Sequence, residues 1–405
     1  MSGAGSGGGT GGGSGVWLLA LGQTTGYVAQ TFSFAALIVA LGHPVTGAGL
    51  PGAVLAAGPT AGLLLAAIAA PFSGRLLDRG KGPRLLALGP LLGALGLVVA
   101  ALSAGHAALW ILGFLIVGLG QATSQFETCF GYLTRELGGG ARKAIVRVTL
   151  VGGFATTIAF PLAETLSQRF GWQGALLALA LMQVAVTCPL NIAGTRLVAR
   201  QALPQAILQG PGASALGAAL RGRGFWLLAG LLALVWLNHA VLTTYSLPLL
   251  MDRGAAHEVA VMLSAALGPA QVAGRLMLVL AGARLPLRAL TIWVLAGFVA
   301  ASAALMIGRG IPTLWLLYAL VQGASAGIAS ILRPVLAAEI LGRERFGALW
   351  GALSVAPLLA GAAAPMMGAL LLQAGGMPAV ISATLVMAGG ALVLGLILRP
   401  RISAG

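Results

Sequence analysis

Long apolar stretches recur along the 405-residue chain, and short clusters of glycine, proline and charged residues separate them. A helix needs about 20 apolar residues to cross a hydrocarbon core ~30 Å thick. A membrane β-barrel would instead alternate apolar and polar residues over strands of about ten residues. The pattern therefore predicts an all-α polytopic membrane protein. Its twelve expected transmembrane helices cover residues 16–41, 53–77, 84–105, 107–134, 144–168, 172–197, 224–250, 258–283, 286–308, 312–337, 346–373 and 377–398.

The longest connection, residues 198–223, lies between the sixth and seventh spans and is predicted to be a cytoplasmic linker. It divides the chain into an N-terminal six-helix half, residues 16–197, and a C-terminal six-helix half, residues 224–398. Residues 1–15 are rich in Gly and Ser and have no apolar stripe, which is typical of a disordered tail. Residues 399–405 are expected to form a short cytoplasmic tail.

The two halves share a spaced pair of helix-breaking residues. Pro161 is followed ten residues later by Gly171, and Pro365 is followed ten residues later by Gly375. Both pairs are separated by the same offset, so we interpret the halves as a tandem repeat. Two six-helix repeats around a central cavity are the architecture expected of a secondary transporter.

Charge changes this picture in two ways. Only 8% of the residues are charged and 59% are hydrophobic, whereas soluble domains carry about 25% charged residues, so a soluble fold is excluded. With a cytoplasmic N-terminus, 18 of the 23 Lys and Arg residues fall on the cytoplasmic side, three (Arg169, Arg253 and Arg309) on the other, and two inside spans. Positive charge favours the cytoplasmic side. We therefore expect a multi-pass protein of a bacterial inner membrane with both termini cytoplasmic.

A charged loop lies between the second and third spans. It reads Gly74-Arg-Leu-Leu-Asp78-Arg79-Gly-Lys81-Gly-Pro-Arg84, and it resembles the loop signature of the major facilitator superfamily. The resemblance implies an alternating-access transporter in which Asp78 and Arg79 serve as gating residues. It also implies that spans one, four, seven and ten line the cavity.

Two further segments resemble the monocarboxylate and oxalate–formate type branch of this superfamily. One comprises residues 132–135, 141–144 and 152–153, and the other is Gln271-Val-Ala-Gly-Arg275 in span eight. In that branch the arginine of the second motif holds the substrate carboxylate, and its partner aspartate is Gln271 here. Span five lacks the Gly-Pro signature of drug exporters, so efflux of a drug or metabolite by proton antiport stays the alternative.

Three ionisable residues lie inside predicted spans, namely Glu127, Arg275 and Arg333. Such residues are costly in a membrane and are functional candidates by default. Two arginines against one carboxylate favour an anionic substrate, because a guanidinium matches a carboxylate with two hydrogen bonds. A small monocarboxylate-like anion carried with protons is the predicted substrate. Glu127 and His239 are the candidate proton carriers, because burial raises a carboxylate pKa and histidine titrates near neutrality.

Polar residues in the expected cavity helices complete the candidate site. Gln23, Tyr27 and Gln30 share one helical face of span one. Span four adds Gln121 and Gln125. The alternative is that such polar side chains only hold helices together. The predicted substrate-binding residues are Tyr27, Gln30, Asn238, His239, Arg275 and Arg333.

No enzymatic chemistry is predicted. The sequence has no Walker-type phosphate loop and no metal-spaced His/Cys group. Cys129 and Cys188 both lie inside apolar stretches and suggest neither a disulfide nor a metal site. We expect no cofactor and no nucleic-acid partner. The chain is expected to be a monomer. Its expected partners are the anionic substrate, protons and membrane lipid.

Overall fold

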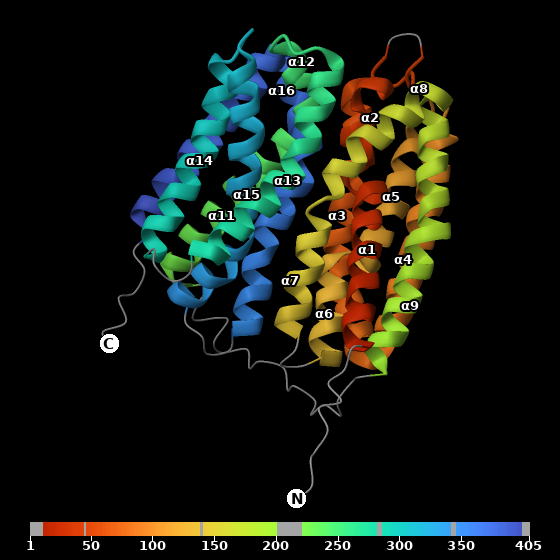
Figure 1. Ribbon diagram of the computed structural model, residues 1–405. Coiled ribbons are helices and arrows are strands. Elements are labelled where there is room, and N and C mark those ends of the chain that lie inside the picture. The colour runs from red at the N-terminus through yellow and green to blue at the C-terminus, as the bar shows by residue number, and fades with distance from the viewer. Residues whose placement is uncertain are drawn as a thin grey trace, which may run out of the picture.

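Every regular element is a helix in the residues that the structure, a computed structural model, describes: 11–43, 46–137, 141–200, 221–281, 286–341 and 346–398 (Figure 1). The N-terminal half contains α1 (Gly11–Gln30), α2 (Ser33–Leu41), α3 (Gly52–Leu76), the wide turn η1 (Leu77–Lys81), α4 (Gly82–Ala101), α5 (Ala107–Ser124), α6 (Phe126–Leu137), α7 (Ala141–Gly152), α8 (Ala155–Met182), η3 (Gln183–Thr187) and α9 (Cys188–Ala199). The C-terminal half contains α11 (Arg223–Thr244), α12 (Ser246–Asp252), α13 (His257–Ala281), α14 (Leu287–Ile307), α15 (Pro312–Leu341) and α16 (Phe346–Ile397).

These helices provide twelve membrane crossings. Ten described stretches are long and apolar enough to span a membrane, and two of them, Lys143–Ala199 with 57 residues and Val355–Ile397 with 43, are long enough to cross twice. Each double stretch reverses at a glycine in the left-handed region, Gly171 with φ 70° and Gly376 with φ 65°, which other residues adopt only with strain. The predicted all-α fold with two six-helix repeats is confirmed.

Some predicted boundaries differ from the observed ones. Helix α1 begins at Gly11, so five residues of the predicted tail 1–15 are helical. Residues 1–10, the central part of the predicted linker (201–220) and the tail 399–405 lie outside the described residues.

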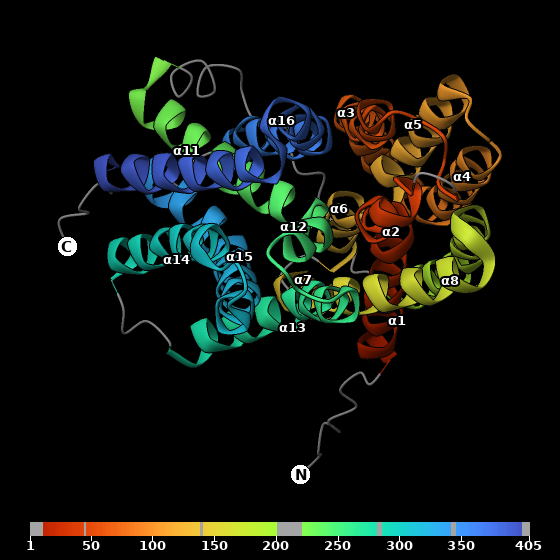
Figure 2. The same cartoon turned by 90° about the horizontal axis from the view of Figure 1, so that it is seen from above.

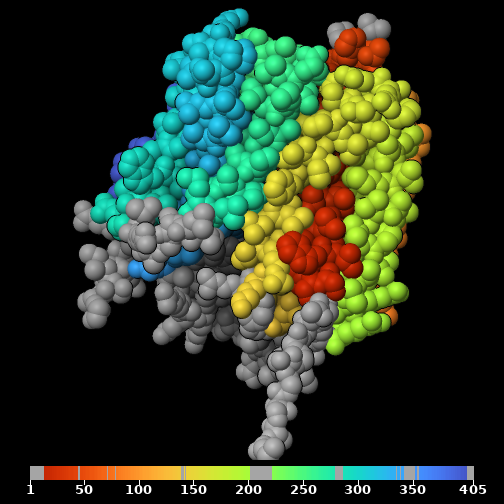
Figure 3. Space-filling view, viewed as in Figure 1, coloured from red at the N-terminus to blue at the C-terminus, as the bar shows by residue number. Residues whose placement is uncertain are grey.

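The halves lie side by side and meet along two pairs of helices, α8 with α13 and α3 with α16 (Figures 1 and 2). Figure 3 shows the first seam from outside, with α8 in yellow against α13 in green. We call the end where α9 ends and α11 begins the linker end, and the opposite end, with α2 and α12, the distal end.

Buried apolar side chains show which end is closed. One continuous core at the distal end combines residues of both halves, such as Leu37 and Leu41 of α2 with Leu247 and Leu249 of α12. Towards the linker end the described residues form two separate cores, one in each half. The halves therefore pack together at the distal end, and their buried cores are separate towards the linker end.

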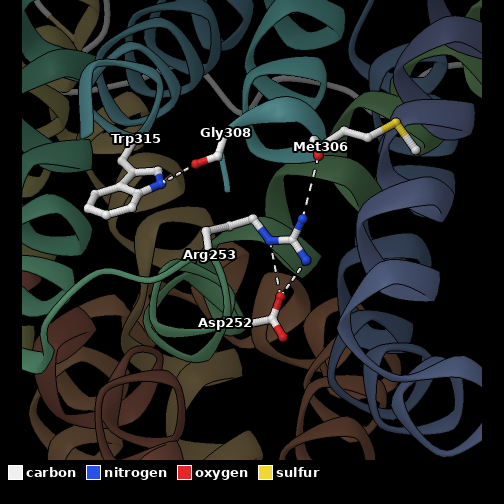
Figure 4. Close-up of polar contacts among 5 residues, drawn as sticks. All are labelled: Asp252, Arg253, Met306, Gly308 and Trp315. Carbon is white, nitrogen blue, oxygen red and sulfur yellow. Dashed lines mark hydrogen bonds and ion pairs between the residues drawn. The ribbon is translucent and has the colours of Figure 1, made fainter. Parts of the chain in front are cut away.

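The C-terminal half is fastened at its distal end by a buried arginine (Figure 4). The Arg253 guanidinium pairs with Asp252 and donates a hydrogen bond to the Met306 carbonyl oxygen at 3.4 Å. Nearby, Trp315 Nε1 donates to the Gly308 carbonyl oxygen at 2.7 Å. The Arg253 bond connects the turn after α12 with the end of α14, and the Trp315 bond closes the turn between α14 and α15.

Close packing in the N-terminal half depends on glycine. A Cβ atom on Gly118 of α5 would lie 2.0 Å from the Gly62 carbonyl oxygen of α3. We expect Gly118→Ala to push α3 and α5 apart and to cost about 1–3 kcal/mol, measured as a lower melting temperature of the purified protein. Gly389→Ala is the matched control, because nothing lies within 4 Å of the added Cβ there. Equal melting temperatures for both variants would contradict this packing.

Candidate functional site

Three of the predicted cavity helices are interrupted. Span one breaks between α1 and α2 at Thr31 and Phe32, span four breaks between α5 and α6 at Gln125, and span seven breaks between α11 and α12 at Tyr245. None of these residues is glycine or proline. Broken helices leave backbone groups without helical partners, which in a membrane is tolerated only where protein or water satisfies them.

Glutamine side chains satisfy the first two breaks reciprocally. Gln23 Nε2 of span one donates to the Ser124 carbonyl oxygen at the end of α5 at 2.7 Å, and Gln121 Nε2 of span four donates to the Gln30 carbonyl oxygen at the end of α1 at 2.6 Å. Gln125 Nε2 also donates to Thr31 Oγ1 at 2.8 Å. Each span therefore caps the break in the other.

A further glutamine, in span six, extends this network. Gln183 is fully buried in η3, and its Oε1 accepts a hydrogen bond from Gln30 Nε2 at 3.2 Å. Gln23 and Gln30 are each 2% exposed. The face of Gln23 and Gln30 therefore packs inside the N-terminal half, and we leave Gln30 out of the site that we assign below.

Asn238 has the same role in the C-terminal half. Its Nδ2 donates to Ser302 Oγ at 3.1 Å and to the Thr384 carbonyl oxygen at 2.8 Å, and its Oδ1 accepts from Gln322 Nε2 at 3.2 Å. Asn238 is completely buried. It ties α11, α14, α15 and α16 together, so we leave it out of the site as well. The next residue, His239, is only partly buried.

On the N-terminal side, an aromatic cluster surrounds the start of α6. The Tyr27 and Phe126 rings are 4.4 Å apart between centroids, and Phe126 stacks on Phe130 at 5.0 Å. Glu127 lies in the first turn of α6 and its side chain is exposed. A carboxylate is favoured there by the positive end of the helix dipole.

On the C-terminal side, a cation lies over an aromatic ring. The Arg333 guanidinium of α15 is 5.4 Å from the centroid of the Trp236 ring of α11, a cation–π arrangement. The Trp236 and His239 rings are 6.5 Å apart. Arg333 of α15 and Glu127 of α6 are contributed by different halves and carry opposite charges.

We call Tyr27, Phe126, Glu127, Trp236, His239 and Arg333 the central site. The sequence pointed to Tyr27, Glu127, His239 and Arg333 through their polarity. It missed Phe126 and Trp236, whose aromatic character does not distinguish them from residues that face lipid. Among the described residues, no group of three or more His, Cys, Asp or Glu side chains could hold a metal ion.

Arg275 is bonded to both halves at the seam between them. Its Nη1 donates to the Thr149 carbonyl oxygen of α7 at 2.6 Å, and its Nε donates to Ser330 Oγ of α15 at 3.2 Å. The guanidinium is therefore occupied by protein groups of both halves. An anion at this position would have to displace them.

The predicted gating loop forms the wide turn η1. Gly80 within it has φ 78°, and Arg135 at the end of α6 donates from Nη1 to the Leu77 carbonyl oxygen at 2.7 Å. Arg79 is exposed. The side chain of Asp78 lies outside the described part of the chain, so its gating role stays a prediction.

Comparison with solved structures identifies the fold. The nucleoside transporter NupG and a point mutant of it each superimpose with a TM-score of 0.69 at 14% sequence identity, over 95–96% of this chain and 98% of theirs. The chain has the major facilitator superfamily fold. No family model matches the sequence, and no curated protein matches it either. The likeness to the monocarboxylate and oxalate–formate branch stays a prediction, because both of these structures with the major facilitator fold are of a nucleoside transporter.

Proposed function

We propose that the protein is a secondary transporter that moves a small polar molecule across a membrane by alternating access. The observation that carries this proposal is a set of ionisable and aromatic side chains on spans that both halves contribute, Glu127 on α6 and Arg333 over Trp236 among them. The shared distal core and the separate linker-end cores support it, because they describe a molecule closed at one end only.

Proton coupling is proposed through Glu127. Its side chain is exposed at the start of α6, and Arg333 of the other half supplies a positive charge. Protonation of Glu127 removes the attraction between the halves and leaves Arg333 as the dominant charge of the central site. Binding of a proton would thereby change both the affinity for substrate and the balance between the two states.

For the substrate we propose a nucleoside-like molecule, that is, a planar ring with hydroxyl groups. The aromatic rings of Tyr27, Phe126 and Trp236 offer stacking surfaces, and Glu127 and Arg333 together leave the site close to neutral. NupG, which shares the fold, is a nucleoside transporter. The second candidate is an organic anion, because the Arg333 guanidinium supplies positive charge beside the Trp236 ring.

Ligand-dependent thermal unfolding of the purified protein separates these substrates. A compound raises the melting temperature only if it binds the folded state preferentially. We expect uridine or adenosine to raise it and lactate or oxalate to leave it unchanged. Uptake of the same radiolabelled compounds into proteoliposomes with an imposed pH gradient then tests transport. A shift with the carboxylates alone would favour the anion, and absence of any gradient-driven flux would contradict the transporter proposal.

Arg275 offers an independent test of substrate class. We expect Arg275→Ala to leave the affinity for a nucleoside within about twofold, because its guanidinium bonds to Thr149 and Ser330. If the substrate is a carboxylate held by Arg275, the same change should weaken binding by about 10–100-fold, since a hydrogen bond to a charged group contributes about 1.5–3 kcal/mol. Equilibrium binding to wild type and variant distinguishes the two cases.

The orientation is also a proposal. We propose that the linker end faces the cytoplasm, because positive charge is concentrated there and favours that side. A cysteine introduced at Pro211 should therefore resist an impermeant thiol reagent added to intact cells and react after the cells are opened. Ready labelling of intact cells would reverse the proposed topology.

A further inference from the structure

The seam between α8 and α13 contains a point of very close approach. A Cβ atom on Gly268 of α13 would lie 2.6 Å from the Gly153 carbonyl oxygen and 2.6 Å from Thr156 Oγ1. In the opposite direction, a Cβ on Gly153 would lie 2.8 Å from Val272 Cγ2. The two halves therefore cross with their backbones almost touching, which makes this crossing a natural pivot.

Polar contacts between the halves lie on both sides of this pivot. His257 Nε2, eleven residues before Gly268, is 2.8 Å from Glu164 Oε1 of α8 at the distal end. Arg275, seven residues after Gly268, donates to the Thr149 carbonyl oxygen on the linker side. At 1.5 Å per residue these contacts are about 16 Å and about 10 Å from the pivot. Rotation that opens one end must break the contact on that side.

The distal contact between His257 and Glu164 differs chemically from the contact between Arg275 and Thr149. Histidine is charged or neutral depending on pH in the range of about 5–8, whereas arginine stays protonated. The side chains of His257 and Glu164 are 28% and 21% exposed, so solvent protons reach them. Gln168 Nε2 holds the same Glu164 oxygen at 2.5 Å, which fixes the carboxylate in place for the histidine.

Other charged groups at this end do not pair with His257. Arg253 and Asp252, in the turn that leads into α13, are bonded to each other. Glu258, the next residue of α13, is exposed, and so is Arg169 of α8. Arg309, before α15, and the histidines His43, after α2, and His106, before α5, are further ionisable groups at the distal end of the described chain. Among the described residues, Glu164 is the charged residue that lies within hydrogen-bonding distance of His257.

We propose that Glu164 and His257 form a pH-sensitive latch that holds the distal end closed. When His257 is protonated, the ion pair joins α8 to α13 and favours the state described above. When His257 loses its proton, the charge attraction is lost and the distal end opens more readily. Acid therefore favours the distally closed state, and alkali favours the distally open one. This device acts on the conformational equilibrium and needs no assumption about the substrate.

The test is a distance measurement across the distal end of the full-length protein. Spin labels on cysteines at Gln173 and Thr313, exposed residues of the two halves, report opening by pulsed electron paramagnetic resonance. The native Cys129 and Cys188 are buried and are replaced in the labelled protein. Between pH 5.5 and pH 8 we expect the ratio of open to closed molecules to rise about two- to fivefold, the range that a partly exposed ion pair provides.

Variants identify the residues responsible. In a Glu127→Gln background, which removes the other proposed proton carrier, His257→Asn and Glu164→Gln should give the same ratio at both pH values, and His257→Lys, which keeps its charge, should stay closed at pH 8. Glu258→Gln is the matched control for a carboxylate at this end and should keep the wild-type pH dependence. A wild-type ratio that does not change with pH, or a pH dependence that persists in His257→Asn, would overturn the latch. The wild-type measurement alone decides whether the ratio of open to closed molecules depends on pH, even where a variant fails to fold.

Discussion

Glu127→Gln should reduce proton-driven accumulation of substrate in proteoliposomes to the level of vesicles without protein. Glutamine has nearly the shape of a protonated glutamate but cannot release a proton, so a cycle that requires release stops. Exchange of labelled for unlabelled substrate needs no net proton movement and should continue. Measuring both fluxes on the same preparation separates a coupling defect from loss of binding.

The control for this experiment lies on the same helix. Glu136, near the end of α6, contacts Arg135 at 3.8 Å at the linker end and lies outside the central site. Glu136→Gln should therefore retain proton-driven accumulation. Unchanged accumulation by Glu127→Gln would exclude Glu127 as the proton carrier and make His239 the next candidate.

Arg333→Ala should weaken substrate binding by about 10–100-fold, because it removes a charged hydrogen-bond donor from the central site and uncovers the Trp236 ring. Arg333→Lys keeps the charge but loses the flat guanidinium that lies over Trp236. We therefore expect it to restore only part of the affinity. Isothermal titration with the compound that shifts the melting temperature measures these effects.

A double-mutant cycle tests whether Arg333 acts together with Glu127. If the two charges interact across the site, Glu127→Gln combined with Arg333→Gln should lose less affinity than the sum of the single changes. Additive losses of affinity would mean that the two charges act separately. That result would contradict coupling between the halves through Glu127 and Arg333.

The sequence predicted the number of crossings and their division into halves, because both follow from the lengths of the apolar stretches. It also located the reversals at Gly171 and near Gly375, since glycine accepts backbone conformations that other residues avoid. It did not predict the breaks in spans one, four and seven. No glycine or proline marks them, and they persist because side chains distant in sequence supply the missing hydrogen bonds.

The separation of interacting residues along the chain also explains which site residues could be predicted from the sequence. Charge inside a span is rare enough that Glu127 and Arg333 stood out without a structure. Amides are ambiguous, because a glutamine can face a cavity or cap a carbonyl, as Gln30 and Gln121 show. Which role applies depends on the neighbouring helix, and a single sequence does not say which helix that is.

The paired amides of the N-terminal half have a consequence for synthesis of the protein. Gln30 meets its partner Gln183 across 153 residues of chain, which at ~5–20 residues per second takes a ribosome roughly 8–30 s. Polar side chains make passage of a helix from the translocon into lipid less favourable, and the first span is less apolar than the ninth. During that interval we expect the nascent first span to remain beside the insertion machinery or a membrane chaperone. Cells that lack such a chaperone should therefore degrade this protein before its sixth span emerges.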